Sequence, residues 1–129
     1  MKYISAKHFE KLNFRIGQIK AVKKHPEIDE YILLIDLGPV DQDAQIIADL
    51  KESYKMKDLI GKQVVYLENF ESTYIKGVES QGLLLVTQKN GKPVLVKPDK
   101  KVLVGVRVGG LQDTVVHYHY KAGEHGKYK

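Results

Sequence analysis

The side chains best suited to chemistry in this chain lie in a long polar stretch, residues 68–81. Asn69, Ser80 and Gln81 carry short donors and acceptors that can read the edges of an unstacked base. Tyr74 can stack on a base, and Lys76 can pair with a phosphate. Alternatively, Asn69 and Ser80 only fix a long loop through local hydrogen bonds. The residues alone leave both interpretations open.

A second polar stretch, residues 23–30, is placed to flank the same site. Lys24 can approach an anion, whereas His25 is either a ligand contact or a turn residue, because Pro26 follows it. Arg15 has two equal interpretations, a phosphate contact or an ion pair with a carboxylate across the sheet.

Histidines near the C-terminus raise the question of a metal. His117 and His119 alternate along a predicted strand and share one face, but only His125 stands near them as a third ligand. Tyr118 and Tyr120 occupy the other face, which suits burial against a partner chain. We expect a surface or interface strand here, with no metal and no cofactor.

The sequence has no cysteine, which excludes disulfides, thiolate zinc sites, iron–sulfur clusters and cysteine nucleophiles. It also lacks a phosphate-cradling glycine loop, a nucleophile elbow and a helical zinc motif. Glu68 and Glu71 are three residues apart, but this spacing fixes no separation in a loop. We therefore expect a protein that is not an enzyme.

The charge favours anionic partners. There are 21 basic and 16 acidic residues, a net charge of +5, and the pI is about 9.2. Residues 1–30 and 97–129 supply the excess, whereas residues 31–96 are net negative. Arg15 and Arg107 are the only arginines, and a lysine-rich surface suits phosphate contact better than base readout. A merely solubilising lysine coat is an equally good interpretation.

The length of 129 residues predicts a single domain over residues 1–120, with a flexible tail over 121–129. Hydrophobic residues make up 43% of the chain, enough for one ordinary core. No apolar run reaches the roughly 18–20 residues that span a bilayer, and the start turns polar too soon for a signal peptide. We expect a cytoplasmic protein without a membrane partner.

Apolar periodicity and turn residues predict a mainly β chain. The expected elements are a short helix over 6–11 capped by Ser5, a strand from 12 with a bulge at Gly17, strands over 31–37 and 44–48, a helix over 51–59, strands over 63–67 and 83–87, an Asn90-Gly91 hairpin into 93–96, and β-like segments over 102–108 and 114–120. One helix after the third of five strands is the order of an OB-fold, an all-β Greek-key barrel that binds ligands between the loops after strands 1 and 4. Those loops are residues 23–30 and 68–81.

Four runs of the sequence resemble the tRNA-binding OB domain family. They are FEKLNFRIGQI at 9–19, HP at 25–26, LIDLG at 34–38 and GVESQGLLL at 77–85. The family includes domains appended to methionyl-tRNA synthetases, free-standing tRNA-binding proteins and CsaA-type export chaperones. The likeness extends from about residue 9 to residue 108.

This resemblance implies non-catalytic, largely shape-directed binding of tRNA or structured RNA by a homodimer. The free-standing members dimerise through the N-terminal segment and the C-terminal strands. The nucleic-acid contacts we expect on this basis are Lys24, His25, Asn69, Tyr74, Lys76, Ser80 and Gln81.

Two departures from the family pattern lie in the predicted binding loops. Residues 27–30 read EIDE where members have NADK, and residues 71–74 read ESTY where members often carry a basic cluster. Each lost phosphate contact weakens RNA binding. An acidified loop beside an apolar groove favours an alternative, a CsaA-like chaperone that binds unfolded polypeptide. A third, weaker possibility is a detached accessory subunit of an aminoacyl-tRNA synthetase.

Overall fold

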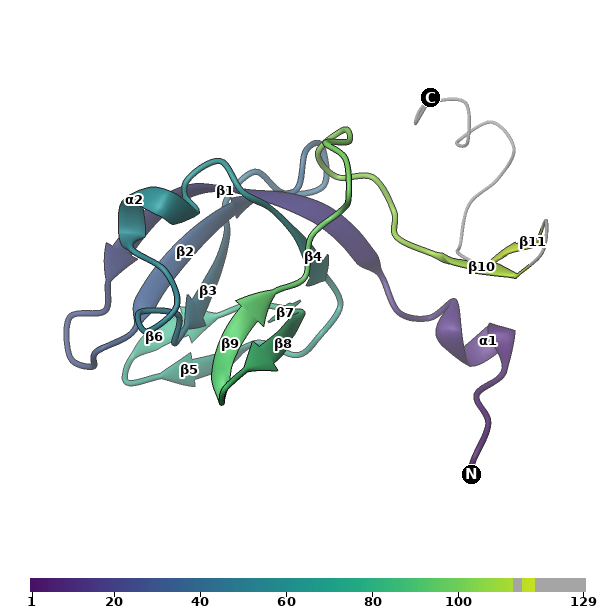
Figure 1. The fold of residues 1–129 in the computed structure, drawn as a ribbon, viewed down its shortest axis with the longest axis horizontal. Coiled ribbons are helices and arrows are strands. Elements are labelled where there is room, and N and C mark those ends of the chain that lie inside the picture. The colour runs from purple at the N-terminus through teal and green to yellow at the C-terminus, as the bar shows by residue number, and fades with distance from the viewer. Residues whose placement is uncertain (113–114, 118–129) are drawn as a thin grey trace.

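Five antiparallel strands form a strongly bent sheet in the computed structural model, which describes residues 1–112 and 115–117. Their order is β3-β2-β1-β4-β7 (Figure 1). The strands are β1 (Phe14–Lys24), β2 (Tyr31–Asp36), β3 (Ala44–Ala48), β4 (Gln63–Leu67) and β7 (Leu83–Leu84). This nearly closed, all-β barrel confirms the predicted OB-fold class.

Smaller elements surround the barrel. They are α1 (Ala6–Phe9), α2 (Met56–Leu59), β5 (Thr73–Ile75), β6 (Val78–Ser80), β8 (Val86–Lys89), β9 (Lys92–Leu95), β10 (Gly110–Gln112) and β11 (Val115–His117). Ser5 caps α1 as predicted, since its Oγ accepts a hydrogen bond from His8 N at 3.2 Å. The Asn90-Gly91 turn joins β8 to β9, and both of its residues have positive φ, as a two-residue hairpin requires.

The bulge in β1 lies three residues beyond the predicted one. The register with β2 shifts between Ile19 and Ala21, whereas Gly17 pairs regularly with Val64. A Cβ at Gly17 would lie 2.5 Å from Ile35 Cγ2, so this position requires glycine for close packing rather than for a bulge.

Other predicted elements are shorter than expected. The helix over 51–59 is reduced to α2, because residues 51–53 form a turn that closes on the carbonyl of Leu50. The strand over 83–87 is divided into β7 and β8. Within 102–108 only Arg107 forms a bridge, to Arg15. Of the segment 114–120, residues 115–117 form β11; residues 114 and 118–120 and the predicted tail 121–129 lie outside the described residues.

Side chains close the gap between β3 and the end of the sheet at β7. Ser80 Oγ accepts a hydrogen bond from Ile47 N at 3.0 Å, and Gln81 Oε1 accepts one from Gln45 N at 3.0 Å. Gln81 N donates in turn to the Gln45 carbonyl at 2.7 Å. The edge of β3 is therefore satisfied here by Ser80, at the end of β6, and by Gln81, and not by a strand paired with it in the sheet.

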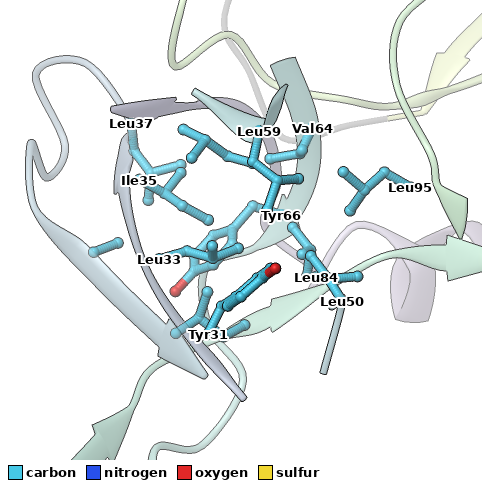
Figure 2. Close-up of a cluster of buried hydrophobic side chains, with 13 residues drawn as sticks. Tyr31, Leu33, Ile35, Leu37, Leu50, Leu59, Val64, Tyr66, Leu84 and Leu95 are labelled. Carbon is cyan, nitrogen blue, oxygen red and sulfur yellow. The ribbon is translucent and has the colours of Figure 1, made fainter. Parts of the chain in front are cut away.

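The core fills the inside of this bent sheet (Figure 2). Leu33 and Ile35 from β2, Val64 and Tyr66 from β4, and Leu59 from α2 all lie almost fully out of solvent. This burial explains why β2 is a near-continuous apolar run, and why a helix of only four residues is held in place. No helix in the described part of the chain is long and apolar enough to cross a membrane.

Candidate nucleic-acid interface

The two predicted binding loops meet at one end of the barrel. His25, directly after β1, lies within hydrogen-bond distance of β5, since its Nε2 is 2.9 Å from the Ile75 carbonyl oxygen. We call these two loops, residues 23–30 and 68–81, the loop mouth. They meet at the β5–β6 hairpin, whereas Glu68 and Asn69 lie beside the start of β1. In Figure 1 the two loops meet where the turn between β1 and β2 approaches the β5–β6 hairpin.

His25 has a structural role that differs from the predicted ligand contact. Its side chain is buried, and Nδ1 accepts hydrogen bonds from the backbone N–H of Glu27 at 3.0 Å and of Ile28 at 3.3 Å. An accepting Nδ1 leaves the proton on Nε2, which therefore donates to the Ile75 carbonyl. With both ring nitrogens engaged, His25 holds the loop mouth together and leaves no free group for a ligand.

Asn69, Ser80 and Gln81 are also bonded within the protein. The alternative weighed for Asn69 and Ser80 was local hydrogen bonding, but their partners are distant in the sequence. Asn69 Oδ1 accepts from Asn13 N at 2.9 Å, and its Nδ2 donates to the Lys11 carbonyl at 2.7 Å. Ser80 is buried, and together with Gln81 it bonds to the edge of β3. These three side chains position the loop on the barrel.

Two positioning residues were not found from the sequence. Gln45 Nε2 donates to the Glu79 carbonyl at 2.8 Å, which fixes β6 beside β3. Tyr66 donates its hydroxyl hydrogen to the Gln81 carbonyl, and burial, with the charges of Asp41 and Glu68, raises the pKa of this phenol. A glutamine and a tyrosine in predicted strands gave no signal, because their partners are distant in sequence.

Close packing explains the glycine after Gln81. Gly82 has φ +67°, and a Cβ there would lie 2.7 Å from Tyr66 Cε2. Only glycine fits the turn and the contact together.

Among the predicted contacts, Lys24, Tyr74 and Lys76 are exposed, and so are Lys23, Phe70 and the carboxylates of Glu27 and Glu71 in the same loops. Tyr74 is 69% exposed on β5, and Lys76 occupies the tip of the β5–β6 hairpin. Lys76 and Gly77 have φ of +49° and +84°, so this turn has the same two-residue form as Asn90-Gly91. The hairpin thus presents one aromatic ring and one cation to solvent.

Carboxylates outnumber cations in the loop mouth. Arg15 donates to Glu68 Oε1 at 2.8 Å and to the Gly105 carbonyl at 2.9 Å, which supports the ion-pair interpretation of this arginine. Lys51 pairs with Asp29 at 2.6 Å, and this bond and charge lower the pKa of the Asp29 carboxyl. Apart from these two paired carboxylates, the two loops carry four more, Glu27, Glu30, Glu71 and Glu79, and three lysines, Lys23, Lys24 and Lys76.

Two apolar hollows lie outside the loop mouth. One, of about 280 Å³, is lined by the α1 segment and β10, including Ile4, Phe9 and Leu111. The other, of about 270 Å³, lies between β3 and the β7–β9 region and includes Ile47, Leu83 and Val86. No group of three or more potential metal ligands occurs within the described residues. The His117 side chain and the predicted residues His119, Tyr118, Tyr120 and His125 lie outside the described part.

Comparison with known proteins finds similar sequences within methionine–tRNA ligases. Methionine–tRNA ligase from Thermococcus kodakarensis is 41% identical over 109 residues, which cover 84% of this chain but 14% of that protein. The enzyme from Archaeoglobus fulgidus is 41% identical over 106 residues, 81% of this chain and 16% of that protein. The chain thus spans only about a seventh of these relatives.

Two similar solved structures match over nearly their whole length. The chaperone CsaA from Bacillus anthracis aligns with a TM-score of 0.73 and 28% identity, covering 83% of this chain and 99% of that one. A MetRS-related protein from Pyrococcus horikoshii aligns with a TM-score of 0.74 and 26% identity, covering 84% and 99%. A family model described as a putative tRNA-binding domain matches residues 14–107, and the chain therefore belongs to this tRNA-binding domain family.

Proposed function

We propose that this protein binds tRNA or another structured RNA in the cytoplasm without catalysing a reaction, through a domain formed by residues 1–120. The observation that carries this proposal is the family match over residues 14–107. The exposed Tyr74 and Lys76 on the β5–β6 hairpin support it, as does Lys24 in the loop that His25 joins to that hairpin. In this proposal Tyr74 stacks on an exposed base, while Lys24 and Lys76 contact phosphates.

Salt-dependent gel-shift binding of bulk tRNA tests the proposal. We expect the wild-type affinity to fall steeply with salt, because lysine–phosphate contacts release counterions. Tyr74→Ala should weaken binding by about 1–3 kcal/mol if the ring stacks on a base. Lys76→Asn removes a cation but suits the positive φ of its turn, so it should flatten the salt dependence without disturbing the hairpin.

Lys89→Gln is the matched control, since it removes one exposed cation from the other two-residue hairpin. It should leave tRNA binding nearly unchanged. A wild-type Kd weaker than about 100 μM at low salt, with no salt dependence, would end the proposal.

We also propose that two copies associate through an apolar surface that includes Tyr3, Ile4 and Leu111, near the two ends of the described chain. Tyr3, Ile4 and Leu111 are 90%, 71% and 75% exposed, and two of them line one hollow. Exposed apolar groups clustered in this way are typical of interfaces. In sedimentation experiments Leu111→Asp should yield monomers, whereas Leu103→Asp, an exposed leucine outside this hollow, should not.

Binding of unfolded polypeptide is the second candidate function. The apolar hollow between β3 and β7–β9 favours it, as does the likeness to proteins titled CsaA chaperones. Suppression of the aggregation of a model protein, unaffected by added tRNA, would support it. Val86→Glu in the hollow should abolish that suppression and Thr87→Glu, on the other face of β8, should not.

A third candidate is an accessory subunit that binds a synthetase in trans. The match to a short part of methionine–tRNA ligases supports it. Co-purification with a synthetase from the source cells would identify this role, and its absence under conditions that retain tRNA would exclude a stable complex.

A further inference from the structure

A basic pocket lies outside the loop mouth, between the turn that precedes β4 and the segment that follows β9. Its volume is about 270 Å³. Lys62, Lys97 and Lys101 line it together with one carboxylate, Asp99. We call this the basic pocket.

Hydrogen bonds fix the walls of the basic pocket. Gln63 Nε2 donates to the Val102 carbonyl at 2.7 Å, and Gln63 Oε1 accepts from Val102 N at 3.1 Å. On the other side Gly61 N donates to the Ile19 carbonyl at 2.7 Å. The three lysines therefore project from backbone that is anchored to β1 and β4, and the binding of a ligand does not require ordering of the segment.

Within residues 1–112 and 115–117, the lysines of the basic pocket form no ion pair with a carboxylate. The ion pairs in the described residues are Arg15–Glu68, Lys20–Asp43 and Lys51–Asp29, and none involves Lys62, Lys97 or Lys101. Lys62 instead lies over the Tyr54 ring, with its Nζ 5.8 Å from the centroid. Because three lysines and one carboxylate line the pocket, its net charge is positive, which favours a bound anion.

The chemistry of the pocket selects a phosphate. Its cations are lysines, which act as point charges, and the pocket includes neither an arginine fork nor an aromatic side chain that could read a base. Gln18 of β1 pairs with Gln63 beside the pocket, whereas Lys24, at the loop mouth, is six residues further along the same strand. At about 3.3 Å per residue this separation is about 20 Å, so only an extended polyanion reaches both sites.

We propose that the basic pocket binds a backbone phosphate of the same RNA, as a second contact apart from the loop mouth. This inference rests on the proposed RNA binding. It adds Lys62, Lys97 and Lys101 to the phosphate contacts proposed for Lys24 and Lys76 at the loop mouth.

The test compares the salt dependence of tRNA binding for the wild type and for Lys97→Gln/Lys101→Gln. Each lost phosphate contact reduces the slope of log K against log salt by about 0.7–0.9. We expect a reduction of about 1–2 in the slope and an affinity loss of about tenfold at low salt. The thermal unfolding midpoint should not change, because both lysines are exposed.

Lys89→Gln/Lys92→Gln is the matched control, because it removes the same charge from the tip of the β8–β9 hairpin, at the end of the molecule away from the turn over 97–105 (Figure 1). Equal losses in both double variants would overturn the pocket and indicate an effect of net charge. In a parallel acetylation footprint, bulk tRNA should protect Lys97 and Lys101 but not Lys89 and Lys92. Wild-type binding with an unprotected pocket refutes this inference alone, whereas no wild-type binding refutes the proposed function with it.

Discussion

The loop mouth and the basic pocket differ in charge and in what occupies their polar groups. The loop mouth has three lysines and six carboxylates, and most of its polar side chains bond to the barrel. The basic pocket has three lysines and one carboxylate, and none of these groups forms an ion pair among the described residues. For the proposed RNA binding, this difference predicts a division of work in which the mouth adds the exposed Tyr74 ring and the pocket adds the larger net positive charge.

The largest effect should come from the residue that joins the two halves of the mouth. His25→Ala removes three hydrogen bonds from a buried site. Because each contributes about 0.5–1.5 kcal/mol, we expect the free energy of unfolding to fall by about 2–4 kcal/mol. Urea unfolding with an unchanged m-value measures this. His8→Ala, in exposed α1, is the control, and a loss for His25→Ala no larger than that of the control would contradict the assigned role.

Gln63→Ala is the corresponding change at the basic pocket. It removes two hydrogen bonds to Val102 from a partly exposed site. We therefore expect the free energy of unfolding to fall by about 1–2 kcal/mol, which is less than for His25→Ala. Hydrogen exchange should show faster exchange of the Val102 amide, whereas the Ile19–Gly61 bond should keep its protection. Unchanged exchange at Val102 would mean that other contacts hold this segment.

Neutralising single carboxylates should show how much the charge of the loop mouth and the charge of the basic pocket each affect tRNA affinity. Glu27→Gln and Glu71→Gln each remove an exposed negative charge from the mouth, and each should strengthen tRNA binding, by up to about fivefold for a phosphate about 4 Å away. Asp99→Gln should do the same at the pocket. If only Asp99→Gln has an effect, RNA does not approach the acidic loops, and the division of work becomes a single site.

The smallest effect concerns the exposed pair of Asp29 and Lys51. The pKa of Asp29 is lowered in the folded protein, so its contribution to stability is present above the unfolded pKa of about 3.9 and is lost as pH falls through the folded value. Asp29→Asn should therefore slightly reduce the fall in unfolding midpoint between pH 5 and pH 2. Asp43→Asn removes the other exposed lysine–aspartate pair and shows whether the change is specific to the mouth.

The parts of the fold that follow from local patterns were predicted well. The strands 44–48 and 63–67, the Ser5 cap and the Asn90-Gly91 hairpin depend on alternation, capping and turn residues that are visible in a short window. The β5–β6 hairpin was missed because a lysine at positive φ is not a usual signal for its turn. The length of the helix over 51–59 was wrong because tertiary contacts override its weak periodicity.

Site residues were harder to predict because their partners are distant in the chain. His25 bonds to a residue 50 positions away, and Asn69 to residues 56 and 58 positions away. The family resemblance located the loops, and the structure divides their residues into those that hold the loop and those that face solvent. The basic pocket had only a faint signal, the excess of lysine after residue 96.

Closure of the barrel by Ser80 and Gln81 has a consequence for the behaviour of the protein at high concentration. An uncovered β3 would offer free N–H and C=O groups to another copy and seed sheet growth between molecules. The side chains of Ser80 and Gln81 occupy the N–H groups of Ile47 and Gln45, and the backbone N–H of Gln81 occupies the Gln45 carbonyl. We therefore expect these bonds to help keep the protein soluble. Replacing Ser80 with alanine would thus leave the Ile47 N–H on the β3 edge unpaired. We expect a concentrated sample of this variant to aggregate sooner than the wild type while the fold is still intact.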